Sequence, residues 1–280
     1  MEKKGSLGGA FRFCCEFANM PIVDLPHLLG AFGAAFLAGA INSVAGGGTM
    51  ISFPALVALG LPPVIANATN TVGIWPGSLG SIWGFRKELG RVNKRMLWLL
   101  LPALVGGLGG ALLLRSTPPG VFEKMVPWLI FFATLLFIIQ AQVQKRLKSV
   151  EAARHAGAGW LTTAILAQLC VAIYGGYFGA GMSIMALSVL GLLGMTDILE
   201  MSATTSLLAC AINGAAGLVF AFAGLVAWPF ALAMTTGALA GGYGAAGVAR
   251  KIGKVTVRRF VVMVGITITV VMFIRVFTVK

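Results

Sequence analysis

Polar, uncharged side chains recur beside two glycine clusters in a chain that is otherwise strongly apolar. The clusters are Gly46-Gly47-Gly48 and Gly179-Ala180-Gly181. A run of glycines interrupts a helix, at a cost of about 1 kcal/mol per glycine relative to alanine. The helix that follows presents its first N–H groups and the positive end of its dipole to the gap. Because such a gap suits negative charge, we expect a small anion to bind there.

Amide and hydroxyl side chains near the clusters would complete the site. Asn67, Asn70 and Thr71 stand at i, i+3 and i+4 and share one helix face. Thr204 and Thr205 hold the positions equivalent to Asn70 and Thr71. For a single Ser or Thr, hydrogen bonding between packed helices is the simpler explanation, and glycines also permit close packing. We predict a substrate-binding set of Asn42, Gly46, Gly47, Gly48, Thr49, Asn67, Asn70, Thr71, Gly179, Gly181, Ser183, Thr204 and Thr205.

Ionisable groups are scarce where chemistry would need them. The 8 acidic residues all fall near the ends of apolar segments or in loops, and the only histidines are His27 and His155. Proton relays and cation pumps place such groups at mid-membrane, so no proton carrier can be named. A metal site and a catalytic triad are not expected. No cofactor is expected, and no phosphate-binding loop for ATP is present.

Composition places the chain in a membrane. Apolar residues make up 58% and charged residues 10%, whereas a soluble domain carries about a quarter charged residues. The outer surface must therefore face hydrocarbon. The net charge of +13 lies largely in short loops, so we attribute it to the positive-inside rule rather than to nucleic-acid binding.

Apolar segments repeat along the chain. Ten are expected, at 25–45, 49–61, 64–85, 96–115, 121–142, 157–178, 181–194, 198–223, 225–248 and 258–278. The second and seventh are shorter than the roughly 20 residues that span a bilayer, and each follows a glycine cluster, as broken helices of transporters do. The predicted organisation is a juxtamembrane segment (1–24), a first transmembrane repeat (25–142), a connecting loop (143–156) and a second repeat (157–280).

The two halves share several motifs in one order. Three motifs recur at an almost constant spacing, which indicates duplication. They are the glycine clusters, the Leu-Gly pairs Leu59-Gly60 and Leu193-Gly194, and the triplets Thr69-Asn70-Thr71 and Ala203-Thr204-Thr205. Each half has five segments, an odd number, so the second half would be inverted if every segment crosses the membrane. The basic loops stand at different positions in the two halves, which also favours an inverted second repeat with both termini outside. A parallel arrangement with re-entrant short segments is the alternative. The fold class expected is an all-α polytopic membrane protein of two inverted repeats.

These segments resemble a known family. The stretch Asn42–Thr71, NSVAGGGTMISFPALVALGLPPVIANATNT, is similar to the first signature of the TauE/SafE (TSUP) sulfite exporter family, and the stretch beginning at Gly175 is similar to the second. The resemblance implies transport of small sulfur-containing anions such as sulfite or sulfoacetate. The second half departs from the first at two positions, because Leu187 stands opposite Pro54 and Met201 opposite Asn67.

The function expected is a secondary transporter, or permease, of the cytoplasmic membrane that moves a small anion, and not an enzyme. Its expected partners are the anion and the lipid bilayer, without nucleic acid and with a homo-oligomer left open. The alternatives are an anion channel of the same fold and a membrane-embedded enzyme, which would need an ionisable group at depth.

Overall fold

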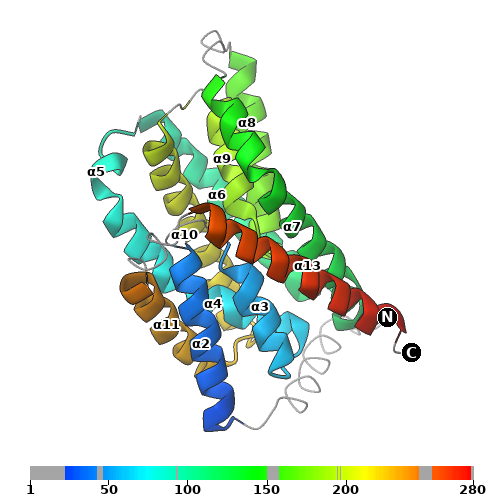
Figure 1. The fold of residues 1–280 in the computed structure, drawn as a ribbon. Coiled ribbons are helices and arrows are strands. Elements are labelled where there is room, and N and C mark those ends of the chain that lie inside the picture. Colours follow the sequence, from blue (N-terminus) through cyan, green and yellow to red (C-terminus); the bar gives the residue numbers. More distant parts are fainter. Residues whose placement is uncertain are drawn as a thin grey trace, which may run out of the picture.

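The computed structural model describes residues 23–42, 47–92, 94–149, 158–193, 195, 197–245 and 254–278, and within these ranges it contains helices and no strand (Figure 1). The elements are α2 (Leu25–Asn42), α3 (Thr49–Ala58), α4 (Pro63–Gly84), α5 (Arg86–Leu89), the 3₁₀ helix η1 (Lys94–Leu99), α6 (Leu100–Ser116), α7 (Pro119–Ser149), α8 (Ala158–Tyr177), α9 (Met182–Leu192), α10 (Ile198–Phe222), α11 (Trp228–Ala240), the π-helix η2 (Gly241–Ala245) and α13 (Lys254–Thr278).

Every predicted apolar segment coincides with a helix, so the all-α membrane class is confirmed. Four helices are long and apolar enough to cross a bilayer, at Leu25–Asn42, Met96–Ser116, Pro119–Ile139 and Leu199–Phe222. α3 and α9 have 10 and 11 residues, which at a rise of about 1.5 Å per residue reach roughly half-way through the hydrocarbon. The two short segments are therefore half-helices, as their lengths predict.

α7 extends beyond the apolar segment expected at 121–142. It continues as far as Ser149, into the stretch expected to connect the two repeats (143–156). The residues from Gln142 to Ser149 contain no glycine or proline and include several strong helix formers. The helix that begins at Pro119 can therefore extend beyond its apolar part.

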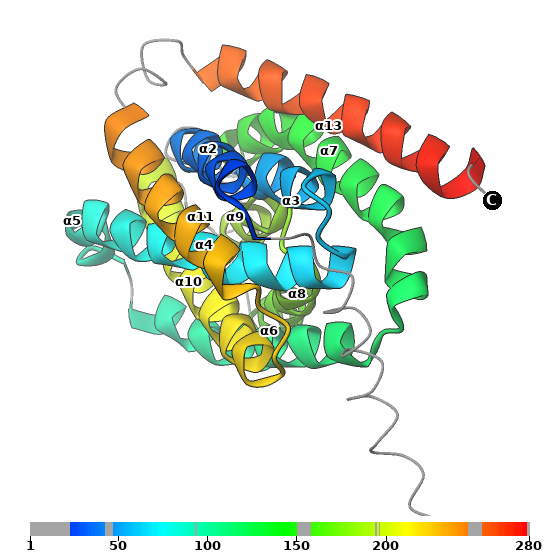
Figure 2. The ribbon, with the colours of Figure 1, turned by 90° about the horizontal axis from the view of Figure 1, so that it is seen from below.

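The helices pack in matched pairs. α6 packs against α8 and α10, and α11 packs in the same way against α2 and α4. α7 packs against α9, α13 packs against α3, and α4 packs against α10. Exchanging the helices from α2 to α7 with those from α8 to α13 therefore preserves the main contacts, as duplication predicts. Figure 1 places α2 and α3 in the lower half of the molecule and α8 and α9 in the upper half. Figure 2 shows α7 and α13 together along one flank.

Glycines allow these helices to approach closely. A Cβ on Gly110 of α6 would lie 2.1 Å from the carbonyl oxygen of Ile173 in α8. A Cβ on Gly241, at the end of α11, would lie 1.9 Å from the carbonyl oxygen of Phe36 in α2. Side chains larger than hydrogen do not fit at either crossing. Close packing at small residues thus stabilises both the α6–α8 and the α11–α2 contacts.

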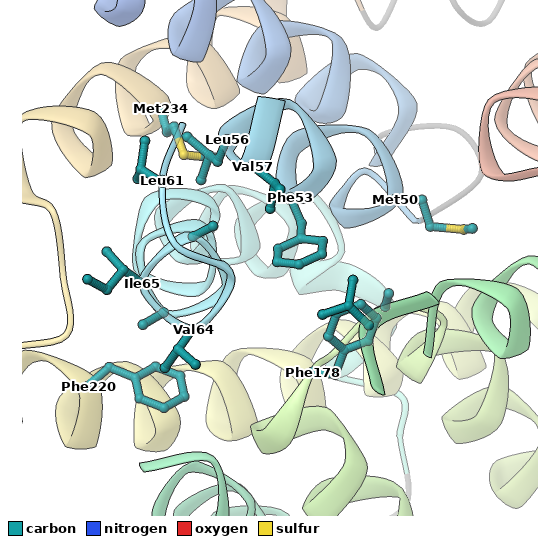
Figure 3. Close-up of a cluster of buried hydrophobic side chains, with 14 of the residues drawn as sticks. Met50, Phe53, Leu56, Val57, Leu61, Val64, Ile65, Phe178, Phe220 and Met234 are labelled. Carbon is teal, nitrogen blue, oxygen red and sulfur yellow. The ribbon is translucent and has the colours of Figure 1, made fainter. Parts of the chain in front are cut away.

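A buried apolar cluster surrounds α3 and α4 (Figure 3). Phe53 of α3 meets Phe178, which follows α8, with ring centroids 5.3 Å apart in an edge-to-face arrangement. Phe220 of α10 and Met234 of α11 belong to the same cluster. The cluster therefore fixes the first half-helix against the end of α8, although these segments are far apart in sequence.

The crossing of α6 and α8 gives a test with an internal control. Gly110→Ala should lower the melting temperature of the detergent-purified protein, because overpacking typically costs about 1–3 kcal/mol. Gly109→Ala in the same helix should leave it unchanged or raise it, since nothing lies within 4 Å of its Cβ position and alanine favours the helix. Equal melting temperatures in a fluorescence-detected size-exclusion assay would contradict this packing.

Candidate functional site

The first interruption separates α2 from α3. α2 ends at Asn42, and α3 begins at Thr49. Gly47 has a backbone φ of 91°, a left-handed conformation that residues other than glycine rarely adopt. The side-chain oxygen Oδ1 of Asn42 accepts a hydrogen bond from the N–H of Gly48 at 2.7 Å. Asn42 therefore holds the start of α3. Gly46, which belongs to the predicted set, lies outside the described residues.

The second interruption separates α8 from α9. α8 ends at Tyr177 and α9 begins at Met182. Gly179 and Gly181 have φ of 82° and 79°. The hydroxyl of Tyr174 donates to the carbonyl oxygen of Ala180 at 2.7 Å. A side chain from the preceding helix thus holds this break as well, although it binds a carbonyl where Asn42 binds an N–H.

Both breaks rest on the same turn of α7. Phe137 occupies the space where a Cβ on Gly47 would stand. A Cβ on Gly181 would contact Leu136 and Ala133. Residues 133 to 137 span about 6 Å along a helix. The two interruptions, which are more than a hundred residues apart in sequence, therefore lie close together inside the protein.

The polar face of α4 connects the two breaks. The Nδ2 group of Asn67 donates to the carbonyl oxygen of Tyr177 at 2.9 Å. The Oδ1 atom of Asn70 accepts from the Oγ of Ser52 in α3 at 2.5 Å. Asn67 and Asn70 are each 1% exposed. The predicted amide face is therefore buried, and it reaches α3 on one side and the end of α8 on the other.

Two of the predicted threonines bond within their own helices. The hydroxyl of Thr71 donates to the carbonyl oxygen of Asn67 at 2.9 Å, and that of Thr204 donates to the carbonyl oxygen of Glu200 at 2.8 Å. Such bonds are common for threonine in helices. The structure thus gives these two side chains a local role. The Oγ1 atom of Thr205 has no partner among the described residues.

The start of each half-helix carries donors for which the described residues offer no acceptor. Among the described residues, no acceptor binds the backbone N–H of Thr49 or of Ser183. Both residues are partly exposed, and each also carries a hydroxyl group. Thr49 is the first residue of α3, and Ser183 is the second residue of α9. Each half-helix therefore carries one such N–H group and one such O–H group in its first turn, near the positive end of its dipole.

No ionisable side chain is buried near this arrangement. The buried polar residues in the described part of the chain are Ser, Thr, Asn and Gln, and none is Asp, Glu, Lys, Arg or His. In those same ranges, no group of three or more His, Cys, Asp or Glu could hold a metal ion. The site is therefore built from neutral dipoles, and its field comes from backbone and amide groups.

Sequence patterns did not reveal three of the contributors. Tyr174 has Ile41 at the equivalent position of the first half, so the repeat carries no signal for it. The turn of α7 at Ala133–Phe137 is apolar apart from Thr134, as in many membrane helices. Thr69 accepts from the N–H of Ala227 at 2.9 Å, and only its place in the Thr-Asn-Thr triplet could have drawn attention to it.

The hydroxyl of Tyr174 can be tested against a neighbouring tyrosine. Tyr174→Phe should destabilise the protein by about 1 kcal/mol, because the carbonyl of Ala180 loses its donor. Tyr177→Phe should have a smaller effect, since the Tyr177 hydroxyl lies 3.4 Å from Thr117 Oγ1, which is a long hydrogen bond. Hydrogen exchange of the amides from 178 to 183 should rise in the first variant alone. Similar exchange in both variants would be inconsistent with this role.

Comparison with known proteins places these features in context. Residues 31–272 match the family model described as Sulfite exporter TauE/SafE. The chain is 30% identical over 250 residues to a "Probable membrane transporter protein" of Haemophilus influenzae, covering 88% of this chain and 94% of the relative. It is 31% identical over 229 residues to the "Probable membrane transporter protein YfcA" of Escherichia coli K12, covering 81% and 82%. No solved structure matches.

Proposed function

Because this chain belongs to the sulfite exporter TauE/SafE family, we propose that it is a secondary transporter of the cell membrane that moves a small sulfur-containing oxyanion or organosulfonate, such as sulfite or sulfoacetate. Its relatives are named as membrane transporters, which favours transport over catalysis. The substrate, the cell membrane as its location and the site residues are parts of the proposal.

One observation carries this proposal. The starts of α3 and α9 both lie against the turn Ala133–Phe137 of α7, while Asn67 and Asn70 of α4 contact the segments on either side. The N–H and O–H groups of Thr49 and Ser183, which have no partner among the described residues, belong to this same region. A buried place rich in donors and without buried carboxylates suits an anion.

Neutral donors also suit a transporter on energetic grounds. An anion that leaves water must recover hydrogen bonds, because burying an unpaired charge costs many kcal/mol. Hydrogen bonds to an ionised acceptor are about twice as strong as neutral ones. Several of them can hold an oxyanion without a Lys or Arg partner, whose attraction in the interior would oppose release. The arrangement therefore favours binding that is reversible.

We also propose that the two repeats are inverted relative to each other. The exchange-symmetric helix pairs and the half-helices in opposite halves of Figure 1 support this arrangement. In inverted-repeat transporters, one repeat rocks against the other around a site near the bilayer midplane. Both interruptions contact one turn of α7. If the repeats rock against each other, this turn would be the place where they move relative to one another.

Asn70 provides a direct test of the site. Asn70→Leu should leave the protein folded, because Ser52 Oγ can still donate to the carbonyl oxygen of Gly48, which lies 3.2 Å away. We expect the uptake of radiolabelled sulfite into proteoliposomes to fall at least tenfold, since one lost hydrogen bond to a charged ligand costs about 1.5–3 kcal/mol. Thr236→Leu, at an exposed position of α11, is the control. Unchanged uptake in Asn70→Leu would remove this residue from the site.

The same assay separates a carrier from a channel. A carrier should saturate with substrate concentration and turn over slowly, whereas a channel of the same fold would conduct in proportion to the gradient. A thermal-shift screen against sulfite, thiosulfate, sulfoacetate, taurine and carboxylate analogues identifies the substrate class, because a ligand that binds only the folded protein raises its stability. Stabilisation by carboxylates alone would refute the sulfur-containing substrate.

A further inference from the structure

A buried amide in the second half has no hydrogen-bond partner. The side chain of Gln168 in α8 is 0% exposed, and neither its Nε2 nor its Oε1 bonds to any described residue. An unpaired buried polar group costs about 1–3 kcal/mol. In native proteins nearly all such groups are paired with protein, water or a ligand. A residue that leaves both ends of an amide unpaired within the protein therefore requires an explanation.

Thr205 in α10 is in the same condition. It is 5% exposed, and its Oγ1 has no partner in the part of the chain that the structure describes. Other buried threonines donate to a carbonyl one turn earlier, as Thr134 and Thr269 do. Because Thr205 makes no such bond within its helix, its hydroxyl can bind a ligand.

The register of α8 and α10 indicates that the two residues stand at a similar level of the bundle. α9 reverses the chain between α8 and α10 and packs against both, so α8 and α10 run in the same direction. Gly175 of α8 faces Ile212 of α10. Gln168 precedes Gly175 by the same seven residues that separate Thr205 from Ile212. Because seven residues make about two helical turns, both side chains return to the faces that meet.

Apolar side chains enclose this position. Val171 and Ala172 of α8, Met201 and Leu208 of α10, and Leu99 and Ala103 at the start of α6 form one buried cluster. Gln168 lies one turn before the α8 pair, and Thr205 lies between the two α10 residues. By their register, Gln168 and Thr205 therefore fall beside this otherwise apolar junction of α6, α8 and α10.

The fold itself does not require this polar pair. In the first half, the residue equivalent to Gln168 is Ala35, which is fully buried. The residue equivalent to Thr205 is Thr71, whose hydroxyl is already bonded to Asn67. The first half thus has no unpaired group at these two positions, although the Oδ1 atom of Asn67 in α4 is also buried without a partner among the described residues. The polar pair in the second half is a departure from the repeat and indicates a ligand.

We propose that Gln168 and Thr205 form a second polar station for the transported oxyanion, between the α6–α8–α10 end of the bundle and the two breaks. Gln168 stands ten residues before Phe178, which is about 15 Å along the helix. Its amide supplies two N–H donors and the threonine one O–H donor, and the amide oxygen accepts from a protonated form of the anion. This inference rests on the proposed function, and it assigns to one half a contact that the other lacks.

Flux measurements with isosteric variants test the station. Gln168→Leu and Thr205→Val should each lower the uptake of radiolabelled sulfite at low concentration about tenfold, through a raised KM, while the melting temperature stays equal or rises. Thr269→Val is the matched control, because Thr269 is buried but its hydroxyl bonds within its own helix. Its uptake should match that of the wild-type protein.

The outcomes separate the two proposals. A stabilised Gln168→Leu variant with wild-type uptake would mean that the amide binds only water, and the station would be refuted. If Gln168→Leu fails to fold, Thr205→Val decides, since valine matches threonine in shape. If the wild-type protein carries none of the screened anions, the proposed function fails and the station fails with it. Wild-type uptake that neither variant alters refutes the station alone.

Discussion

Hydrocarbon offers no partner for a backbone amide, and every other feature of this structure follows from that constraint. A helix that stops inside a membrane exposes N–H and C=O groups that must be paired by protein or by a ligand. This protein stops helices at two places, after Asn42 and after Tyr177. It then surrounds both places with α4 and α7. The interruptions are thereby buried in protein, where irregular backbone is tolerated.

Neighbouring side chains pair part of the broken backbone and leave part of it free. Asn42 binds the N–H of Gly48, and Tyr174 binds the carbonyl of Ala180. The N–H groups of Thr49 and Ser183 stay unbound within the described ranges. A break with every group paired would be only a kink. This division between paired groups and groups without a described partner is the basis of the anion site that we propose.

The polar side chains near the interruptions differ between the two halves. The amides Asn67 and Asn70 face the breaks from the first half, whereas Met201 and Thr204 stand at their equivalents in the second. The second half instead has the buried Gln168, where the first has Ala35. The two halves thus share a framework of corresponding helix pairs but carry different polar groups. An asymmetric path for the solute is compatible with a symmetric scaffold, because packing depends on side-chain size and binding depends on donors.

The amino-acid sequence alone determined the membrane class, the position of every main helix and the two interruptions, because apolar length and glycine runs act locally along the chain. It also placed Asn67 and Asn70 on one face, since helical periodicity is local as well. Apolar length by itself did not set the end of α7, because helix formers continue past the apolar part as far as Ser149. Only the tertiary structure decided that one turn of α7 receives both breaks, that Tyr174 holds the second one and that Gln168 is left without a partner. Each of these depends on contacts between segments distant in sequence, which leave no periodic trace in the chain.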